Sequence, residues 1–254
     1  MPEIINFDID IPQYKTYSEI AVLGDLHKGN RFFDSVLWKR YYIGSASHKG
    51  FKDDSNMYVM CIGDLMETAL KDSLGSQDQE EWIEDQYEWV KDQLEPIADE
   101  GRLIGILEGN HERRATRNWF RTSRLLARDL GVPYGQNSMI VNLILHKGEH
   151  EKKYKMFATH GSGSSRTLAG KLNTVMRMAD IVSDADIYVC GHLHSRIAIT
   201  APIYKDDVEH ERLFGMTGAY LSYGGYAEER MYQPPARGSL KLKLHYDIDR
   251  VSGR

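Results

Sequence analysis

The strongest constraint on the fold is a repeated pairing of a strand-like apolar run with a short polar motif directly after it. The strand-like runs are Ile20–Leu23, Met57–Ile62, Leu103–Leu107, Tyr154–Thr159, Ile187–Cys190 and Leu213–Met216. Five of them are followed at once by a motif: Gly24-Asp25-Leu26-His27, Gly63-Asp64, Gly109-Asn110-His111-Glu112, His160-Gly161 and Gly191-His192-Leu193-His194. Polar side chains at the ends of strands are typical of layered α/β folds, where sites form beyond the carboxyl edge of the sheet.

Helical patterns lie between the strand-like runs, which favours an α/β fold. The clearest amphipathic pattern is Ile83, Tyr87, Val90, Leu94 and Ile97, ending near Gly101. Further helices are expected around Phe33, Val36, Leu37 and Tyr41, over Leu168–Ala179, and over Ser123–Leu130 with Thr122 or Ser123 as N-cap and Gly131 after the C-cap. Met139–Leu145 and Tyr154–Thr159 predict a β-hairpin, and Lys241–Tyr246 predicts a late strand.

Composition narrows the class of protein. The 254 residues contain no repeat or linker, which predicts one domain over 1–254, with a motif-bearing core at 18–220 and a C-terminal extension at 221–254. Cys61 and Cys190 are expected to be buried thiols. No signal peptide or membrane span is evident, so we expect a cytoplasmic protein without a membrane partner. The net charge of −5 excludes a global positive field that would attract nucleic acid.

The motif residues are suited to metal binding. Singly each motif is weak, because an aspartate after glycine is commonly a turn or cap residue and His-Gly is commonly a turn. Together they offer carboxylates and imidazoles, which suit Mn, Fe or Zn, and the lack of thiolates argues against a structural zinc knuckle. Eight candidate ligands at the ends of five strands can hold two ions. Two ions side by side point to phosphoester hydrolysis.

The ordered pattern D-x-H, GD, GNH[D/E], H and GHxH resembles the signature of the calcineurin-like metallophosphoesterase superfamily. The motifs cover residues 24 to 194, and the resemblance implies a four-layer α/β/β/α sandwich. It also implies that Asp25, His27 and His194 bind one metal, that Asn110, His160 and His192 bind the second, and that Asp64 bridges the two. Two divalent cations outweigh two aspartates and a bridging hydroxide, so such a site stays positive and attracts phosphate.

Two residues are expected to assist the metals. The resemblance implies that His111 stabilises the transition state or protonates the leaving oxygen. An imidazole in that role needs a carboxylate to fix its tautomer. Glu67 occupies the position three after Asp64, where the superfamily's protein phosphatases have aspartate, and is the predicted partner. A surface or capping role for Glu67 remains the alternative.

The residues after the second motif differ from those of the superfamily's protein phosphatases, and the difference bears on which substrate is bound. Their second motif continues with Asp-Arg-Gly, whereas this chain has Glu67-Thr68-Ala69. Arg113 and Arg114 are the predicted phosphate contacts instead. Arginines 114, 117, 121, 124 and 128 would form one basic stripe on a single helix, but Thr122-Ser123 favours a break there and an ordinary solvated surface.

Two loops remain open in interpretation. Gly161–Ser165 is either a phosphate-facing loop before a helix or a flexible, capped loop. Tyr220, Tyr223, Tyr226 and Tyr232 form an aromatic segment that resembles the tail of phage-type and prokaryotic members related to DNA-repair exonucleases. These tyrosines would either stack on bases or pack in the core, and Tyr223 is the predicted substrate contact.

The leading hypothesis is a phosphoesterase with two divalent metal ions, leaning to phosphodiesters of nucleic acid or nucleotides. Manganese is the favoured metal, although Fe, Zn, Ni and Co suit the same ligands. The expected partner is a phosphoester substrate such as DNA or a nucleotide, and a homo-oligomer is compatible with the sequence. Alternatives are a broad-specificity or small-molecule phosphomonoesterase and, more remotely, a noncatalytic binding scaffold.

Overall fold

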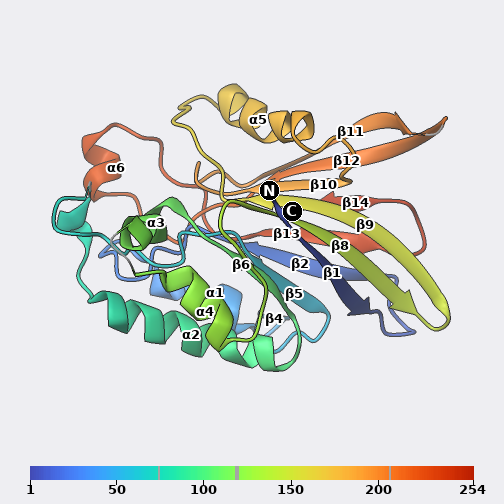
Figure 1. The fold of residues 1–254 in the computed structure, drawn as a ribbon, viewed down its shortest axis with the longest axis horizontal. Coiled ribbons are helices and arrows are strands. Elements are labelled where there is room, and N and C mark those ends of the chain that lie inside the picture. The colour runs from blue at the N-terminus through green and yellow to red at the C-terminus, as the bar shows by residue number, and fades with distance from the viewer. Residues whose placement is uncertain (74, 118–119, 206) are drawn as a thin grey trace.

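Two β-sheets pack face to face between outer layers of helices (Figure 1). The structure is a computed structural model that describes residues 1–73, 75–117, 120–205 and 207–254. Helices α1 (Ser35–Tyr42), α2 (Ile83–Asp99) and α4 (Thr122–Asp129) cover one outer face, and α5 (Leu168–Met176) covers the other. This arrangement is the four-layer α/β/β/α sandwich predicted from the sequence.

Strands that run in parallel carry the motif loops to one end of both sheets. From edge to edge, one sheet contains β14 (Val251–Gly253), β13 (Leu240–His245), β2 (Tyr17–Leu23), β5 (Met57–Cys61), β6 (Leu103–Leu107) and β7 (Tyr134–Gly135). The other contains β1 (Glu3–Asp10), β8 (Ser138–Lys147), β9 (His150–Thr159), β10 (Ile187–Cys190), β12 (Val208–Met216) and β11 (Ile197–Lys205). Strands β2, β5 and β6 are parallel, as are β9, β10 and β12.

The main core lies between the two sheets. Strands β5 and β6 are buried along their whole length, as expected for central parallel strands covered on both faces. Strand β8 alternates instead, with Met139, Val141, Leu143 and Leu145 fully buried and the residues between them half-exposed. The segment 221–254 contributes to this core, because β13 pairs with β2 and buries three leucines between the sheets.

Short elements complete the chain. They are the hairpin β3 (Gly44–Ser45) and β4 (His48–Lys49), the helices α3 (Asn110–Arg117) and α6 (Gly225–Glu229), and the 3-10 helices η1 (Ser76–Asp78) and η2 (Arg177–Asp180). Within the described ranges, no helix combines the length and the hydropathy needed to cross a membrane.

Most predicted elements are confirmed, with differences at their ends. The Met139 hairpin, the late strand and the Ile83 helix are present, and Gly131 follows the C-cap of α4 with φ of +66°. The N-cap prediction is wrong, because α4 begins at Thr122 itself and Arg121 precedes it without a side-chain cap. In α1 the buried side chains are Trp38 and Tyr42, whereas Val36 is 77% exposed.

Candidate metal centre

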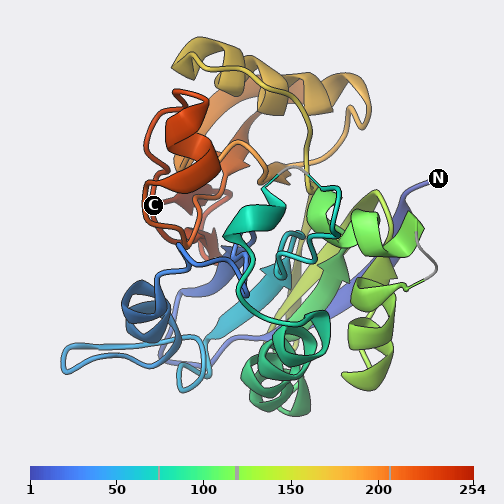
Figure 2. The same ribbon diagram turned by 90° about the vertical axis from the view of Figure 1, so that its left-hand side faces the viewer.

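The five motifs meet at one end of the sandwich, the end that Figure 2 faces. Each follows a strand that stops at this edge, so the loops after β2, β5, β6, β9 and β10 lie together. Helix α3 starts inside the third motif, at Asn110. Residues separated by up to 167 positions in the chain are thereby brought into direct contact.

The motif backbone is held in a sparsely populated conformation. Positive φ values occur at Asp25 (51°), His27 (52°), Asp64 (51°), His192 (66°) and His194 (47°). A left-handed conformation costs a residue other than glycine about 1–2 kcal/mol, and such strain is concentrated at functional sites. Hydrogen bonds between the loops hold the strained residues: the amide of Asp25 donates to Gly63 (3.1 Å) and that of His27 to Asp64 (3.0 Å).

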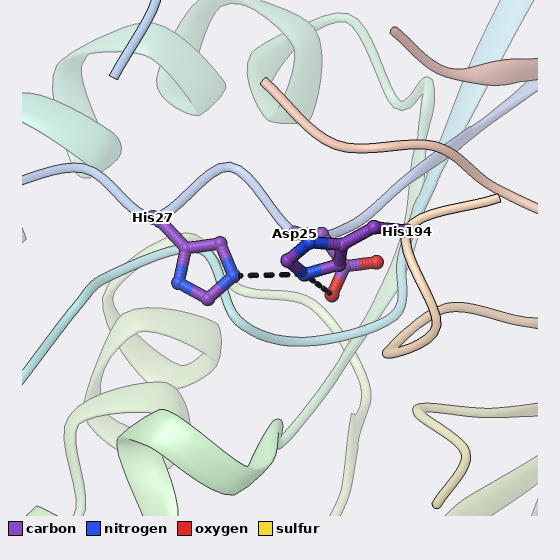
Figure 3. A group of neighbouring side chains, drawn as sticks. All are labelled: Asp25, His27 and His194. Carbon is purple, nitrogen blue, oxygen red and sulfur yellow. Dashed lines mark hydrogen bonds and ion pairs between the residues drawn. The ribbon is translucent and has the colours of Figure 1, made fainter. Parts of the chain in front are cut away.

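Asp25, His27 and His194 form the first group of donor atoms (Figure 3). The Nε2 atoms of His27 and His194 are 3.3 Å apart, and His194 Nε2 is 3.4 Å from Asp25 Oδ1. On its other side, His27 Nδ1 faces Glu67 Oε2 at 3.1 Å. That contact fixes the tautomer that leaves Nε2 free to bind a cation.

Asn110, His160 and His192 form the second group. Asn110 Oδ1 lies 2.9 Å from His160 Nε2 and 2.7 Å from His192 Nδ1. The other ring nitrogen of each histidine is hydrogen-bonded to a backbone carbonyl. His160 Nδ1 lies 2.9 Å from the carbonyl oxygen of Ile62, and His192 Nε2 lies 3.0 Å from that of Gly163. Each imidazole is therefore oriented by a neighbour so that its remaining nitrogen points into the group, as metal-binding histidines require.

Asp64 lies between the two groups. Its Oδ2 atom is 3.2 Å from His160 Nε2 and 3.9 Å from His27 Nε2, while its Oδ1 atom accepts the amide of His111 at 2.8 Å. One carboxylate oxygen thus faces a histidine from each group. The set of carboxylate, imidazole and amide donors fits divalent cations such as Mn, Fe or Zn.

Glu67 joins His27 to His111. Its Oε2 atom accepts from His27 and from the side chain of Asn30 (3.1 Å), and its Oε1 atom lies 3.0 Å from His111 Nδ1. Arg114 lies 3.6 Å from the same Oε1 atom. Each carboxylate oxygen of Glu67 faces one imidazole, so Glu67 orients both His27 and His111.

The charges of the site are mutually stabilised. Burial alone would raise the pKa of Asp64, but His160 and His111 outweigh it and hold that pKa well below its ordinary value. The pKa of Glu67 is likewise lowered against burial by hydrogen bonds from His111 and His27. Burial lowers the pKa of His27, with His111 adding to the effect, which favours the neutral imidazole needed in a metal ligand.

Glu112 fixes the loop that carries Asp64. Its fully buried carboxylate accepts the amides of Asp64 (3.0 Å) and Gly109 (3.1 Å) on Oε2, and those of Leu65 (2.6 Å) and Met66 (3.0 Å) on Oε1. Burial raises the pKa of Glu112 to about 7, Asp64 adds to the shift, and the backbone donors oppose it. Gly109 leaves room for both carboxylates, since a Cβ there would lie 2.1 Å from Asp64 Oδ1 and 2.7 Å from Glu112 Oε2.

A cavity of about 410 Å³ opens beside both donor groups. Asp64, Glu67, His111 and four candidate ligands line one part of it: His27, Asn110, His192 and His194. The rest of the wall comes from the loop after β2, the region of η1, α3, the loop before α5, α5 itself and the segment 221–235. A phosphoester bound here would have access to the metal-binding side chains and to His111.

A calcineurin-like phosphoesterase family profile matches residues 18–196, more than half of the chain. The chain belongs to the calcineurin-like phosphoesterase family. No curated protein sequence matches this phosphoesterase.

Among solved structures, this chain is similar to a conserved protein of Streptococcus pneumoniae TIGR4 described as a predicted phosphoesterase. The two sequences are 13% identical, the match covers 94% of this chain and 98% of that chain, and the TM-score is 0.33. This chain is also similar to zinc-complexed Vps29 of Entamoeba histolytica, with 13% identity, 93% and 97% coverage, and a TM-score of 0.40.

The structure brings together all seven predicted metal ligands of this phosphoesterase, together with His111 and Glu67. Of the predicted substrate contacts, Arg114 lines the cavity, and its guanidinium lies 3.2 Å from His111 Nε2. Arg113 instead binds Glu108 and the backbone carbonyl of Gln136. Neither Arg113 nor the exposed Tyr223 lines the cavity in the part of the chain that the structure describes.

Sequence reasoning left other cavity residues unassigned. They include Phe32, Asp78, Arg166, Lys171, Tyr226 and Tyr232. Of these six, only the two tyrosines gave a signal, as members of the aromatic segment. Tyr220 of the same segment is fully buried against Trp38, which is the core-packing alternative. The basic stripe is divided between α3 and α4, in agreement with the predicted break.

Proposed function

We propose that this chain is a phosphoesterase dependent on two divalent metal ions, with a preference for phosphodiesters of nucleic acid or nucleotides. The observation that carries the proposal is the pair of donor groups that share Asp64. Asp25, His27 and His194 would hold one cation, and Asn110, His160 and His192 the other. When bound, two such cations activate water as a nucleophile and neutralise charge that develops on the phosphoryl oxygens.

His111 is the proposed general acid. It lines the cavity, and Glu67 engages its Nδ1, so its Nε2 is the atom that would deliver a proton to the leaving oxygen. Asp64 and Glu67 raise the pKa of His111 against the effect of burial, which favours the protonated form. Arg114, whose guanidinium lies 3.2 Å from the same Nε2, would contact a phosphoryl oxygen beside it.

A preference for diesters is supported by the absence of the arginine that follows the second motif in protein phosphatases, since Thr68 stands there. A broad-specificity or small-molecule phosphomonoesterase is the second candidate, and Arg114 is the observation in its favour, because a guanidinium can grip a terminal phosphate. The relation to DNA-repair exonucleases, the cytoplasmic location and a single domain over 1–254 belong to the same proposal.

Hydrolysis of matched substrates tests the proposal. Purified protein with Mn²⁺ is assayed on bis-p-nitrophenyl phosphate, p-nitrophenyl phosphate and single-stranded DNA. We expect the diesters to be turned over faster than the monoester. Chelation should remove all activity, and added Mn²⁺ should restore it. A strong preference for the monoester would contradict the diesterase assignment. Purified protein that holds no stoichiometric transition metal and hydrolyses none of these esters would instead support the scaffold alternative.

A further inference from the structure

The cavity extends well beyond what a phosphate group fills. Its volume of about 410 Å³ lies in the range of small-molecule sites, roughly 300–1,000 Å³. The metal-binding side chains occupy one part of its lining. Three aromatic side chains from two separate segments occupy another: Phe32, Tyr226 and Tyr232. A ligand anchored by phosphate at the metal-binding residues would therefore meet an aromatic surface.

The aromatic surface is preformed. The amide of Tyr226 donates to the buried carboxylate of Asp78 (3.1 Å), which attaches α6 to η1, and the two elements lie side by side in both views (Figures 1 and 2). Gly224 and Gly225 pack on Phe32, where a Cβ on either would lie 2.3 or 2.4 Å from a ring carbon. A surface held in place by such contacts lowers the ordering cost of binding a flat group.

Cationic side chains stand beside the aromatic rings. The Arg166 guanidinium lies over the Tyr232 ring, 5.2 Å from its centre. Lys171 and Arg114 also line the cavity, and Lys171 Nζ is held by Leu193 O (3.1 Å) and Ser195 Oγ (2.8 Å). Aromatic faces combined with arginine and lysine are the surface that recognises unpaired nucleotides, in which an anionic phosphate and a flat base are joined.

We propose that Tyr226, Tyr232 and Arg166 form a nucleobase subsite, so that the cavity takes one unpaired nucleotide with its phosphate toward the metal ligands. The subsite rests on the proposed function for the position of the phosphate. Stacking accepts any base, so the ligand class is a single nucleotide or the end of a single strand, with little preference for sequence.

Binding of two probes that differ only by the base tests the subsite. Thymidine 5′-monophosphate and 2-deoxyribose 5-phosphate are titrated calorimetrically into Mn²⁺-loaded His111→Asn protein, which keeps turnover low. We expect the nucleotide to bind at least about 10-fold more tightly, as base stacking predicts. Tyr226→Leu and Tyr232→Leu should remove most of that difference. Tyr232→Phe, which keeps the ring, should retain it, and so should Tyr14→Leu, a matched change at an exposed tyrosine.

Equal affinity for the two probes would refute the subsite, as would leucine variants that keep the full difference. If a leucine variant fails to fold, Arg166→Gln provides the test, with a several-fold loss expected for the nucleotide and none for the sugar phosphate. Hydrolysis of bis-p-nitrophenyl phosphate separates this inference from the proposed function. Protein that hydrolyses no ester but binds the base would refute the function and support the subsite. Protein that hydrolyses the ester but binds both probes equally would support the proposed function and refute the subsite.

Discussion

Replacing Glu112 by glutamine should remove hydrogen bonds that hold the loop carrying Asp64 and so destabilise the fold. The native carboxylate accepts four backbone amides, two on each oxygen, at 2.6–3.1 Å. Glutamine has the same shape but one acceptor, so its amino group must face either Leu65 and Met66 or Asp64 and Gly109. Two buried amides then lose their acceptor, each at a cost of about 1.5–3 kcal/mol for a bond to a charged group. The expected loss of unfolding free energy is about 3–6 kcal/mol.

Urea unfolding measured with EDTA present isolates this loss from metal binding. At pH 8 the native carboxylate is largely ionised, since its pKa is about 7. Glu108→Gln is the matched control, because Glu108 is equally buried but accepts the hydroxyl of Thr116 and pairs with Arg113 outside the motif loops. We expect the control to lose less than half as much. A loss below about 1 kcal/mol for Glu112→Gln would refute the reasoning, because a single unmade buried hydrogen bond already costs that much.

Three further substitutions separate catalysis, metal binding and stability. His111→Asn should keep its metal content while turnover falls at least about 10²-fold, as metal analysis and kinetics on one preparation would show; unchanged turnover would remove His111 from the mechanism. Glu67→Gln should weaken Mn²⁺ binding about 10–100-fold in calorimetry, because it disturbs the partner of His27, and unaltered affinity would contradict that role. Arg102→Met should cost about 3 kcal/mol in urea unfolding, since the guanidinium binds the carbonyls of 51, 52 and 57, yet leave Mn²⁺ affinity unchanged; weaker Mn²⁺ binding would show that the two regions are coupled.

The layered α/β fold could be predicted because strand-like apolar runs alternate with helical patterns along the chain. Two of the longer strands, β1 and β11, escaped prediction for identifiable reasons. Strand β1 alternates Phe7 and Ile9 with polar residues, a period-two signal that was present but short. Strand β11 contains Pro202, which argues against a central strand but is tolerated here because β11 lies at the sheet edge.

The candidate ligands could be named because the ordered motifs resemble the signature of the calcineurin-like metallophosphoesterase superfamily. The contacts that hold the motif loops in place could not be predicted from the sequence. The left-handed backbone of Asp25 and Asp64 depends on hydrogen bonds between loops about 40 residues apart. The double contact of Glu67 with His27 and His111 depends on three loops meeting, although the Glu67–His111 pairing itself was predicted.

Substrate contacts were the hardest to predict, because adjacent residues on a helix or loop point in different directions. Arg113 and Arg114 are neighbours, yet only Arg114 is among the residues found to line the cavity. In the aromatic segment, Tyr226 and Tyr232 are among the residues found to line the cavity. Tyr223, the residue predicted from the sequence, is not among them. Spacing in the chain identifies such a segment but not which side chain faces the ligand.

Anomalous diffraction at the manganese edge, from crystals of the protein soaked in Mn²⁺, tests the central claim most directly. We expect two peaks per chain, one among Asp25, His27 and His194 and one among Asn110, His160 and His192, both within ligand distance of Asp64. A single peak, or peaks away from Asp64, in protein that hydrolyses phosphodiesters would contradict it.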